Sequence, residues 1–195
     1  MFSTRMVHVG SFAMIITGMT ALTSMNYHLQ NFSPSDVHHV FRGLSDPEVI
    51  RYYGVQYDSL EATQAQMLFF DELERTGTGK WWAVGESETG LFCGAAGLNN
   101  VDRESASAEI GCWLLPEYQG KGIMKEVLPL VIQYGWQTFQ LQRIEAVIET
   151  DNRASRELFK QLGFELEHTL IDAEIKEGRN ISLDVFTLFR ENLNV

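Results

Sequence analysis

Two glycines flank a lysine in the stretch Gln119-Gly-Lys-Gly-Ile-Met124, where a strand expected over residues 108–115 gives way to a helix expected over residues 122–139. The first backbone N–H groups of a helix have no carbonyl partner within the helix, and the helix dipole adds partial positive charge at the same end. A Gly-rich turn here lets several N–H groups converge on one anion. The spacing therefore predicts a phosphate-binding site, and with it a nucleotide-like ligand.

The residues that follow the turn exclude two common nucleotide-binding motifs. Ile123 stands where a nucleoside-triphosphate loop has the Ser or Thr that binds magnesium. Lys125 stands where a dinucleotide-binding turn has its third glycine. The turn is therefore expected to hold a pyrophosphate without a metal ion and without a nicotinamide.

A second group of polar residues opens the short helix expected over residues 152–161. Asn152 and Ser155 lie three positions apart, and the segment ends in Leu162-Gly-Phe164. Asp151 or Asn152 can also serve simply as a helix cap, because a short polar side chain accepts a hydrogen bond from a free N–H of the first turn. The pair by itself therefore leaves a ligand-binding role and a structural role open.

Together the two segments resemble the GCN5-related N-acetyltransferase (GNAT) superfamily. The motif of that family, Gln/Arg-x-x-Gly-x-Gly/Ala, is matched from Gln119 onward, except that Met124 replaces the small last residue. The stretch from Ser45 to Gly54 and the sequence Glu109-Ile-Gly further resemble the RimJ/RimL type, which acetylates the N-termini of ribosomal proteins. The resemblance covers about residues 26–190.

The resemblance implies acetyl-CoA as cosubstrate and no metal. Its pantetheine arm would lie along the 108–115 strand, which would part from the 143–150 strand at a β-bulge near Trp113-Leu-Leu115. Its pyrophosphate would sit on the N–H groups of residues 120–124, with Lys121 either near the phosphates or in solvent. The cofactor contacts implied are Trp113, Leu114, Leu115, Gln119, Gly120, Lys121, Gly122, Ile123, Met124, Asn152, Ser155 and Phe159.

Acetyl transfer to an amine needs a base, because α-amino groups have a pKa of about 8 and lysines of about 10.4. Glu109 is the favoured base, acting through water, and Glu149 on the neighbouring strand is its rival. By analogy with the family, the backbone N–H of Leu115 stabilises the oxyanion. Many relatives have an acidic tyrosine where this chain has Phe159, so Ser155 becomes the candidate that protonates or hydrogen-bonds the leaving sulfur.

The resemblance leaves the acceptor open. A protein N-terminal α-amine is the leading expectation. The alternatives are a small amine, such as a polyamine, aminoglycoside or amino acid, and a non-catalytic acetyl-CoA-binding module. Trp81, Trp82 and Tyr53 either line an acceptor slot or fill the core, and core filling is favoured.

The composition bounds these expectations. A net charge of −11 argues against nucleic acid as a partner, because phosphate backbones need a basic surface. It is compatible with a cationic substrate and equally with simple solubility.

The apolar stretch from Phe12 to Met19 is too short to span a bilayer. Cys93 and Cys112 are expected as buried free thiols of a cytoplasmic protein, and could face each other across a hairpin near Val101. A homodimer is an open alternative.

The elements that position these residues follow from periodicity. Three strands are expected over residues 81–84, 91–97 and 108–115, and three more over residues 143–150, 164–171 and 181–189. A helix is expected over residues 59–76, with Ala65, Leu68, Phe69 and Leu73 on its buried face. A strand that follows a crossover helix pairs in parallel, so the 108–115 and 143–150 strands are expected side by side. The prediction is a single α+β acetyltransferase-like domain over residues 26–195, mostly antiparallel with one splayed parallel pair. Residues 1–25 form an N-terminal extension or an early strand.

Overall fold

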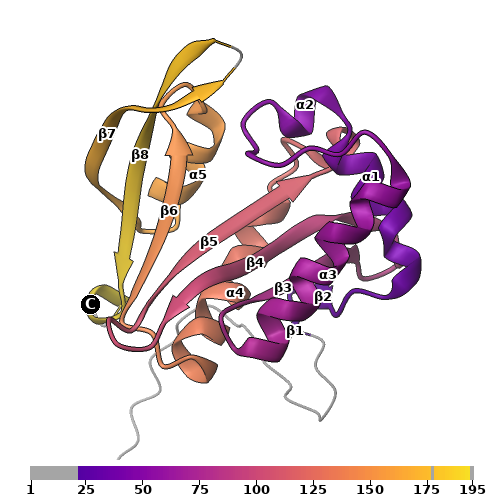
Figure 1. Cartoon of the computed structure of the whole chain (residues 1–195). Coiled ribbons are helices and arrows are strands. Elements are labelled where there is room, and N and C mark those ends of the chain that lie inside the picture. The colour runs from indigo at the N-terminus through magenta and orange to yellow at the C-terminus, as the bar shows by residue number, and fades with distance from the viewer. Residues whose placement is uncertain (1–21, 177, 194–195) are drawn as a thin grey trace, which may run out of the picture.

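An eight-stranded mixed sheet runs through the protein, in the order β1-β2-β3-β4-β5-β6-β8-β7 (Figure 1). The computed structural model describes residues 22–176 and 178–193. All neighbouring strands are antiparallel except β5 and β6, which run parallel. This confirms the predicted α+β sheet with one parallel pair. The strands are β1 (Leu22–Thr23), β2 (Tyr27–Gln30), β3 (Lys80–Glu86), β4 (Phe92–Asp102), β5 (Ser107–Leu114), β6 (Arg143–Glu149), β7 (Glu165–Lys176) and β8 (Arg179–Phe189).

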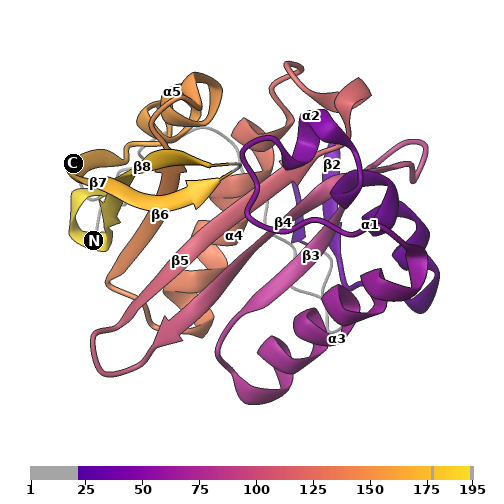
Figure 2. The same cartoon turned by 45° about the horizontal axis from the view of Figure 1, so that its top comes forward.

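Helices cover both faces of this sheet. Figure 2 shows α1 and α3 crossing the face of β3 and β4, with α4 behind the sheet. The side chains between them form two apolar clusters, one under α4 and one under α1 and α3. Because β3 is covered on both faces, six of its seven residues are buried and its sequence shows no alternation. The helices are α1 (Val37–Leu44), α2 (Pro47–Ile50), α3 (Leu60–Thr76), α4 (Ile123–Thr138) and α5 (Arg153–Gln161).

α3 buries a different face from the one that its hydropathy predicts. Leu68 and Phe69, both expected to face the core, are 67% and 45% exposed. Two polar residues lie inward because their polar groups are bonded locally: Thr63 donates to the Ser59 carbonyl, and Gln66 accepts from Tyr57. The buried residues of α3 are Thr63, Gln66, Phe70 and Leu73.

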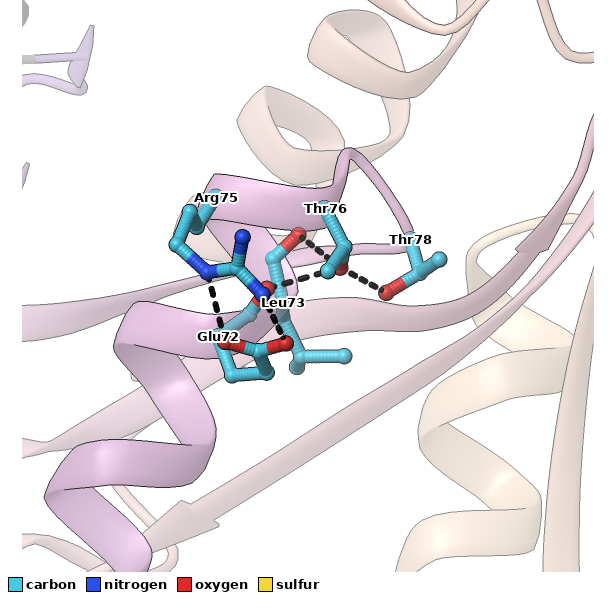
Figure 3. Close-up of polar contacts among 5 residues, drawn as sticks. All are labelled: Glu72, Leu73, Arg75, Thr76 and Thr78. Carbon is cyan, nitrogen blue, oxygen red and sulfur yellow. Dashed lines mark hydrogen bonds and ion pairs between the residues drawn. The ribbon is translucent and has the colours of Figure 1, made fainter.

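The C-terminus of α3 is fixed by its last turn (Figure 3). Gly77 has φ of 69°, a left-handed conformation that glycine adopts without steric cost. The Thr76 hydroxyl donates to the Glu72 carbonyl oxygen at 2.7 Å and lies 2.7 Å from the Thr78 hydroxyl, while the Glu72 carboxylate pairs with Arg75. This turn delivers the chain directly into β3.

The parallel pair parts almost as soon as it forms. Only three pairs join β5 to β6, and the last is Glu109↔Glu145. Beyond it β5 continues with β4 alone and β6 with β8 alone. Figure 1 shows the two strands starting side by side and then diverging.

The prediction of a β-bulge near residues 113–115 is wrong. The β4–β5 register is unbroken from Asn99↔Glu109 to Gly94↔Leu114, and it shifts instead between Asn99 and Asp102, next to the hairpin. The divergence therefore follows from the way each strand keeps its own outer partner, not from an extra residue in β5.

The structure describes only part of residues 1–25, for which an N-terminal extension or an early strand is predicted. Residues 1–21 lie outside the described residues, whereas Leu22–Thr23 forms β1 and pairs with β2. Both cysteines are free thiols, but Cys112 lies opposite Ala96, so the expectation that it faces Cys93 is wrong. Within the described part of the chain, no helix is long and apolar enough to cross a membrane.

Candidate active site

A cavity of about 580 Å³ opens where β5 and β6 diverge. Its walls come from four places in the chain: α2 with the residues that follow it, the end of β5, the turn into α4, and the start of α5. The lining residues are Glu48, Val49, Arg51, Tyr52, Tyr53, Cys112, Trp113, Leu114, Gln119, Gly120, Gly122, Ile123, Met124, Lys125, Asn152, Ala154, Ser155 and Leu158. The cavity thus brings together the two polar segments that the sequence singles out.

The turn into α4 has the conformation that a phosphate cradle requires. Gly120 and Gly122 have φ of 71° and 79°, and a Cβ added at either would meet nothing within 4 Å. The glycines are therefore needed for backbone conformation, and the space beside them is open to a ligand. Among the described residues, no side chain caps the N-terminus of α4. Its first N–H groups and the helix dipole thus suit the pyrophosphate of CoA.

The basic residue beside this turn is not the predicted one. Lys125 lines the cavity, whereas the Lys121 ammonium lies 5.4 Å from the centre of the Tyr118 ring and outside the lining. Gln119 lines the cavity and donates to the Leu114 carbonyl oxygen at 3.2 Å, which joins the turn to the end of β5. Lys121 lies in the turn before α4 and Lys125 in its first turn, and the sequence alone does not show which of them faces the ligand.

The edge of β5 offers free backbone groups, but not at Leu115. The Leu115 N–H donates to the Cys93 carbonyl oxygen at 2.9 Å, so the prediction that it stabilises an oxyanion is corrected. In an antiparallel pair the backbone groups of successive residues point to opposite sides. Residues 109, 111, 113 and 115 therefore bond toward β4, and the N–H groups of Cys112 and Leu114 point to the divergence.

The start of α5 places Asn152 and Ser155 in the wall. Asn152 caps the helix, because its Oδ1 accepts from the Ser155 N–H at 3.1 Å, as the structural alternative expected. Phe159 is buried and packs edge-on against Phe164 at 5.0 Å, outside the cavity lining. Its predicted contact with the cofactor is therefore wrong, and Leu158 lies in the wall instead. The helix turns 100° per residue, so Phe159 falls on the core side.

Glu109 lies at the point where the parallel ladder ends. Its carboxylate accepts a hydrogen bond of 3.0 Å from the Asn100 side chain. Burial raises the pKa of Glu109, the bond from Asn100 opposes that rise, and nearby Glu145 adds to it. Such a group is poised to take a proton, because burial makes the carboxylate more basic than it is in water. Glu109 lies outside the lining of the cavity, on the same strand as Cys112, Trp113 and Leu114, which line it.

The two glutamates on β6, the rival Glu149 and its strand neighbour Glu145, are both paired with cations. Glu149 accepts from Lys176 Nζ at 2.9 Å, and Glu145 lies 2.8 Å from Arg143 Nε. A carboxylate engaged with a cation has fewer free lone pairs for a water or an incoming amine. Of the three glutamates on β5 and β6, Glu109 alone is bonded to an uncharged amide.

The wall contributed by α2 and the residues after it was not predicted residue by residue. Tyr53 both lines the cavity and packs, partly buried, against the apolar cluster under α1 and α3, whereas Trp81 and Trp82 are buried core residues as expected. Burial raises the pKa of Tyr53, so its phenol stays protonated. Burial also raises the pKa of the Cys112 thiol to about 12, which excludes a thiolate nucleophile there.

Comparison with known proteins identifies the class. The chain belongs to the GNAT acetyltransferase family, because the model of the acetyltransferase (GNAT) domain matches residues 27–165. It is 29% identical to the uncharacterized N-acetyltransferase YoaA of Bacillus subtilis over 83% of this chain and 92% of that protein. It is 32% identical to the uncharacterized N-acetyltransferase p20 of Bacillus licheniformis over 75% of this chain and 83% of that protein. The chain is therefore an N-acetyltransferase of the GNAT type.

Relatives with a named acceptor are more distant. The chain is 30% identical to the [ribosomal protein uS5]-alanine N-acetyltransferase of Escherichia coli over 60% of each protein. Among solved structures, the RimL ribosomal L7/L12 α-N-protein acetyltransferase with CoA matches with a TM-score of 0.77 and 21% identity, over 85% of this chain and 95% of that one. The spermidine N-acetyltransferase of Vibrio cholerae with CoA and spermine matches with a TM-score of 0.76 and 17% identity, over 85% and 96%. These structures establish the fold.

Proposed function

We propose that the protein transfers the acetyl group of acetyl-CoA to the α-amine of a peptide or protein N-terminus, by direct attack in a ternary complex. The observation that carries the proposal is the position of Glu109. Among the described residues this carboxylate is bonded to no cation, and it lies where two strands diverge, on the strand whose end lines the cavity that also contains the open N-terminus of α4.

The chain's own residues supply the binding and the proton transfer. The N–H groups of residues 120–124 suit the pyrophosphate, and the free edge of β5 at Cys112 and Leu114 suits the amides of an extended pantetheine arm. Acetyl-CoA contributes the thioester. Glu109 accepts the proton that the ammonium must lose, through water because it lies outside the cavity lining.

Two further roles follow from the wall. The N–H of Leu114 or Cys112 replaces that of Leu115 as the donor for the oxyanion, since both point to the divergence. The Ser155 hydroxyl hydrogen-bonds the departing sulfur. A CoA thiolate is a good leaving group, so a strong acid is not required at this position.

The charges of the acceptor side favour a monoamine over a polyamine. A polyamine carries several ammonium groups, which a site recognises with several free carboxylates. Here Glu149 is paired with Lys176, and the wall formed by α2 and the residues after it contributes one carboxylate, Glu48, and one cation, Arg51. An α-amine also loses its proton more easily than a lysine or polyamine nitrogen, because its pKa is about 8 rather than about 10.4. The similarity to the uS5-alanine enzyme points the same way.

A small polyamine is the second candidate. The fold of the spermidine enzyme is as similar as that of RimL, and the net charge of −11 would attract a polycation. The two unpaired thiols fit a cytoplasmic setting for either acceptor.

The test is an acetyl-transfer assay that follows the release of CoA thiol, with short peptides beginning in Ala, Ser or Met and with spermidine. We expect turnover of at least one peptide and a lower kcat/KM for spermidine. Glu109→Gln should reduce kcat by about 100-fold or more, the contribution typical of a general base. Glu145→Gln, at the paired position on β6, is the matched control and should retain most of the activity. Binding of CoA without acetylation of any peptide or of spermidine would overturn the proposal.

A further inference from the structure

Lys176, at the end of β7, reaches across the divergence of β5 and β6. Its ammonium donates to the Glu149 carboxylate at 2.9 Å, to the Ile50 carbonyl oxygen at 3.5 Å, and to the Arg51 carbonyl oxygen. One side chain thus joins β7, β6 and the end of α2, which is more than 120 residues away in sequence. Figure 1 shows α2 and the β7–β8 hairpin on opposite sides of the divergence.

The two carbonyl contacts bear on the shape of the acceptor wall. The last carbonyls of a helix have no partner within the helix, and a lysine ammonium satisfies both their hydrogen bonds and their negative partial charge. α2 is a single turn of four residues and has little stability of its own. Arg51, Tyr52 and Tyr53, which continue from it, line the cavity. Lys176 therefore anchors the segment that forms this wall.

The contact with Glu149 bears on the charge of the same region. The Glu149 side chain is 13% exposed, and its carboxylate lies on β6 at the divergence. Without Lys176 this carboxylate would be a largely buried, unpaired negative charge beside the end of α2, because the same ammonium contacts both. Such a charge attracts a cation to replace the lost partner.

We propose that Lys176 is a positioning and specificity-determining residue, which holds the α2 wall in place and neutralises Glu149, so that the site favours a single α-amine over a polyamine. The inference rests on the proposed function for its choice of acceptors. The anchoring of α2 can be measured without any acceptor.

The experiment compares Lys176→Met with Lys176→Arg, Glu149→Gln and the double variant Lys176→Met/Glu149→Gln. Lys160→Met is the matched control, because Lys160 on α5 also pairs with a glutamate, Glu157, but on the surface. Lys176→Met should raise the KM for the peptide about tenfold, as for the loss of one charge-assisted hydrogen bond, and leave the KM for acetyl-CoA unchanged. Its ratio of spermidine to peptide kcat/KM should rise, and Lys176→Arg should restore the peptide KM in part.

The double variant separates the two roles of Lys176. It has no unpaired charge, because both partners are replaced, so it should fold as well as wild type. Its ratio of spermidine to peptide kcat/KM should return toward the wild-type value, while its KM for the peptide stays raised. Hydrogen exchange of residues 47–57 should speed up in both variants that lack Lys176, and Lys160→Met should behave like wild type. Unchanged exchange in this segment together with an unchanged acceptor preference would overturn the inference. If neither the wild type nor any variant acetylates an amine, the proposed function fails. Faster hydrogen exchange of residues 47–57 in the variants that lack Lys176 would still establish the anchor.

Discussion

Asn100 donates a hydrogen bond of 3.0 Å to Glu109, from a residue whose own backbone is left-handed, with φ of 53°. The register of β4 against β5 shifts just there, between Asn99 and Asp102. Bulges next to active sites re-aim side chains, and asparagine is one of the few residues that adopt this conformation readily. The irregularity of β4 thus directs the Asn100 amide onto the carboxylate.

Removing the Asn100 amide should move the pH dependence of acetyl transfer. Asn100→Gly keeps the left-handed backbone free of strain and loses only the hydrogen bond. That bond stabilises the charged form of Glu109 and lowers its pKa, so the variant should have a higher pKa for Glu109. The base works when deprotonated, so the acidic limb of kcat/KM should move to higher pH.

Glu145→Gln gives the opposite sign and serves as the control. The negative charge of Glu145 raises the pKa of Glu109, so its removal should move the acidic limb to lower pH. Profiles of both variants that coincide with wild type would show that Glu109 does not set this limb. Titration of the Glu109 carboxyl by NMR checks the same two shifts without turnover.

The left-handed glycines of the cradle should matter for CoA more than for folding. Gly120→Ala and Gly122→Ala each introduce a left-handed alanine, which costs about 1–2 kcal/mol, and the new methyl enters open space beside the cradle. Gly90→Ala has the same φ of 71° and the same free space, but lies in the β3–β4 turn. All three should lose similar stability in urea unfolding, and only the first two should lose CoA affinity by calorimetry. Equal CoA affinity in all three would contradict the cradle.

A tyrosine at position 159, where the family resemblance implies an acid, should not improve catalysis. Phe159 is 4% exposed and packs on Phe164, so Phe159→Tyr buries a hydroxyl, at a cost of about 1–3 kcal/mol if it finds no partner. We expect a lower melting temperature and an unchanged kcat. Phe159→Leu tests packing alone. A clear rise in kcat for Phe159→Tyr would show that the hydroxyl reaches the cavity.

Cys112 should react slowly with alkylating reagents in spite of its place in the cavity wall. With a pKa of about 12, a fraction of about 10⁻⁴ is thiolate at pH 8, and only the thiolate reacts. In a Cys93→Ala background, labelling by iodoacetamide should rise about tenfold per pH unit and be blocked by CoA. Fast labelling at pH 7 that CoA does not affect would place the thiol outside the site.

The sequence predicted those parts of the site whose conformation demands particular residues. Gly120 and Gly122 adopt left-handed backbone that glycine alone takes freely, so the cradle was recognisable from the chain. Leu115 was misassigned because the side to which an N–H points depends on which residues of β4 and β5 form the hydrogen-bonded pairs. The pairing with β4 decides which residues of β5 form hydrogen-bonded pairs, and the sequence of β5 alone does not show it.

Two other features depend on contacts that no local pattern encodes. The inward face of α3 was missed because Thr63 and Gln66 satisfy their polar groups through Ser59 and Tyr57, and can therefore be buried. The anchor formed by Lys176 joins segments more than 120 residues apart, so it emerges only when the chain is folded.

The early end of the β5–β6 ladder has a consequence for solubility. Free strand edges are the places where proteins pair with one another and aggregate, and most folds cover or charge them. Here the free edge of β5 lies within the sheet, between the α2 wall and β6, and not at an outer edge of the sheet. An edge inside the sheet is less open to pairing with another chain than an outer strand is, and it suits one narrow, extended molecule.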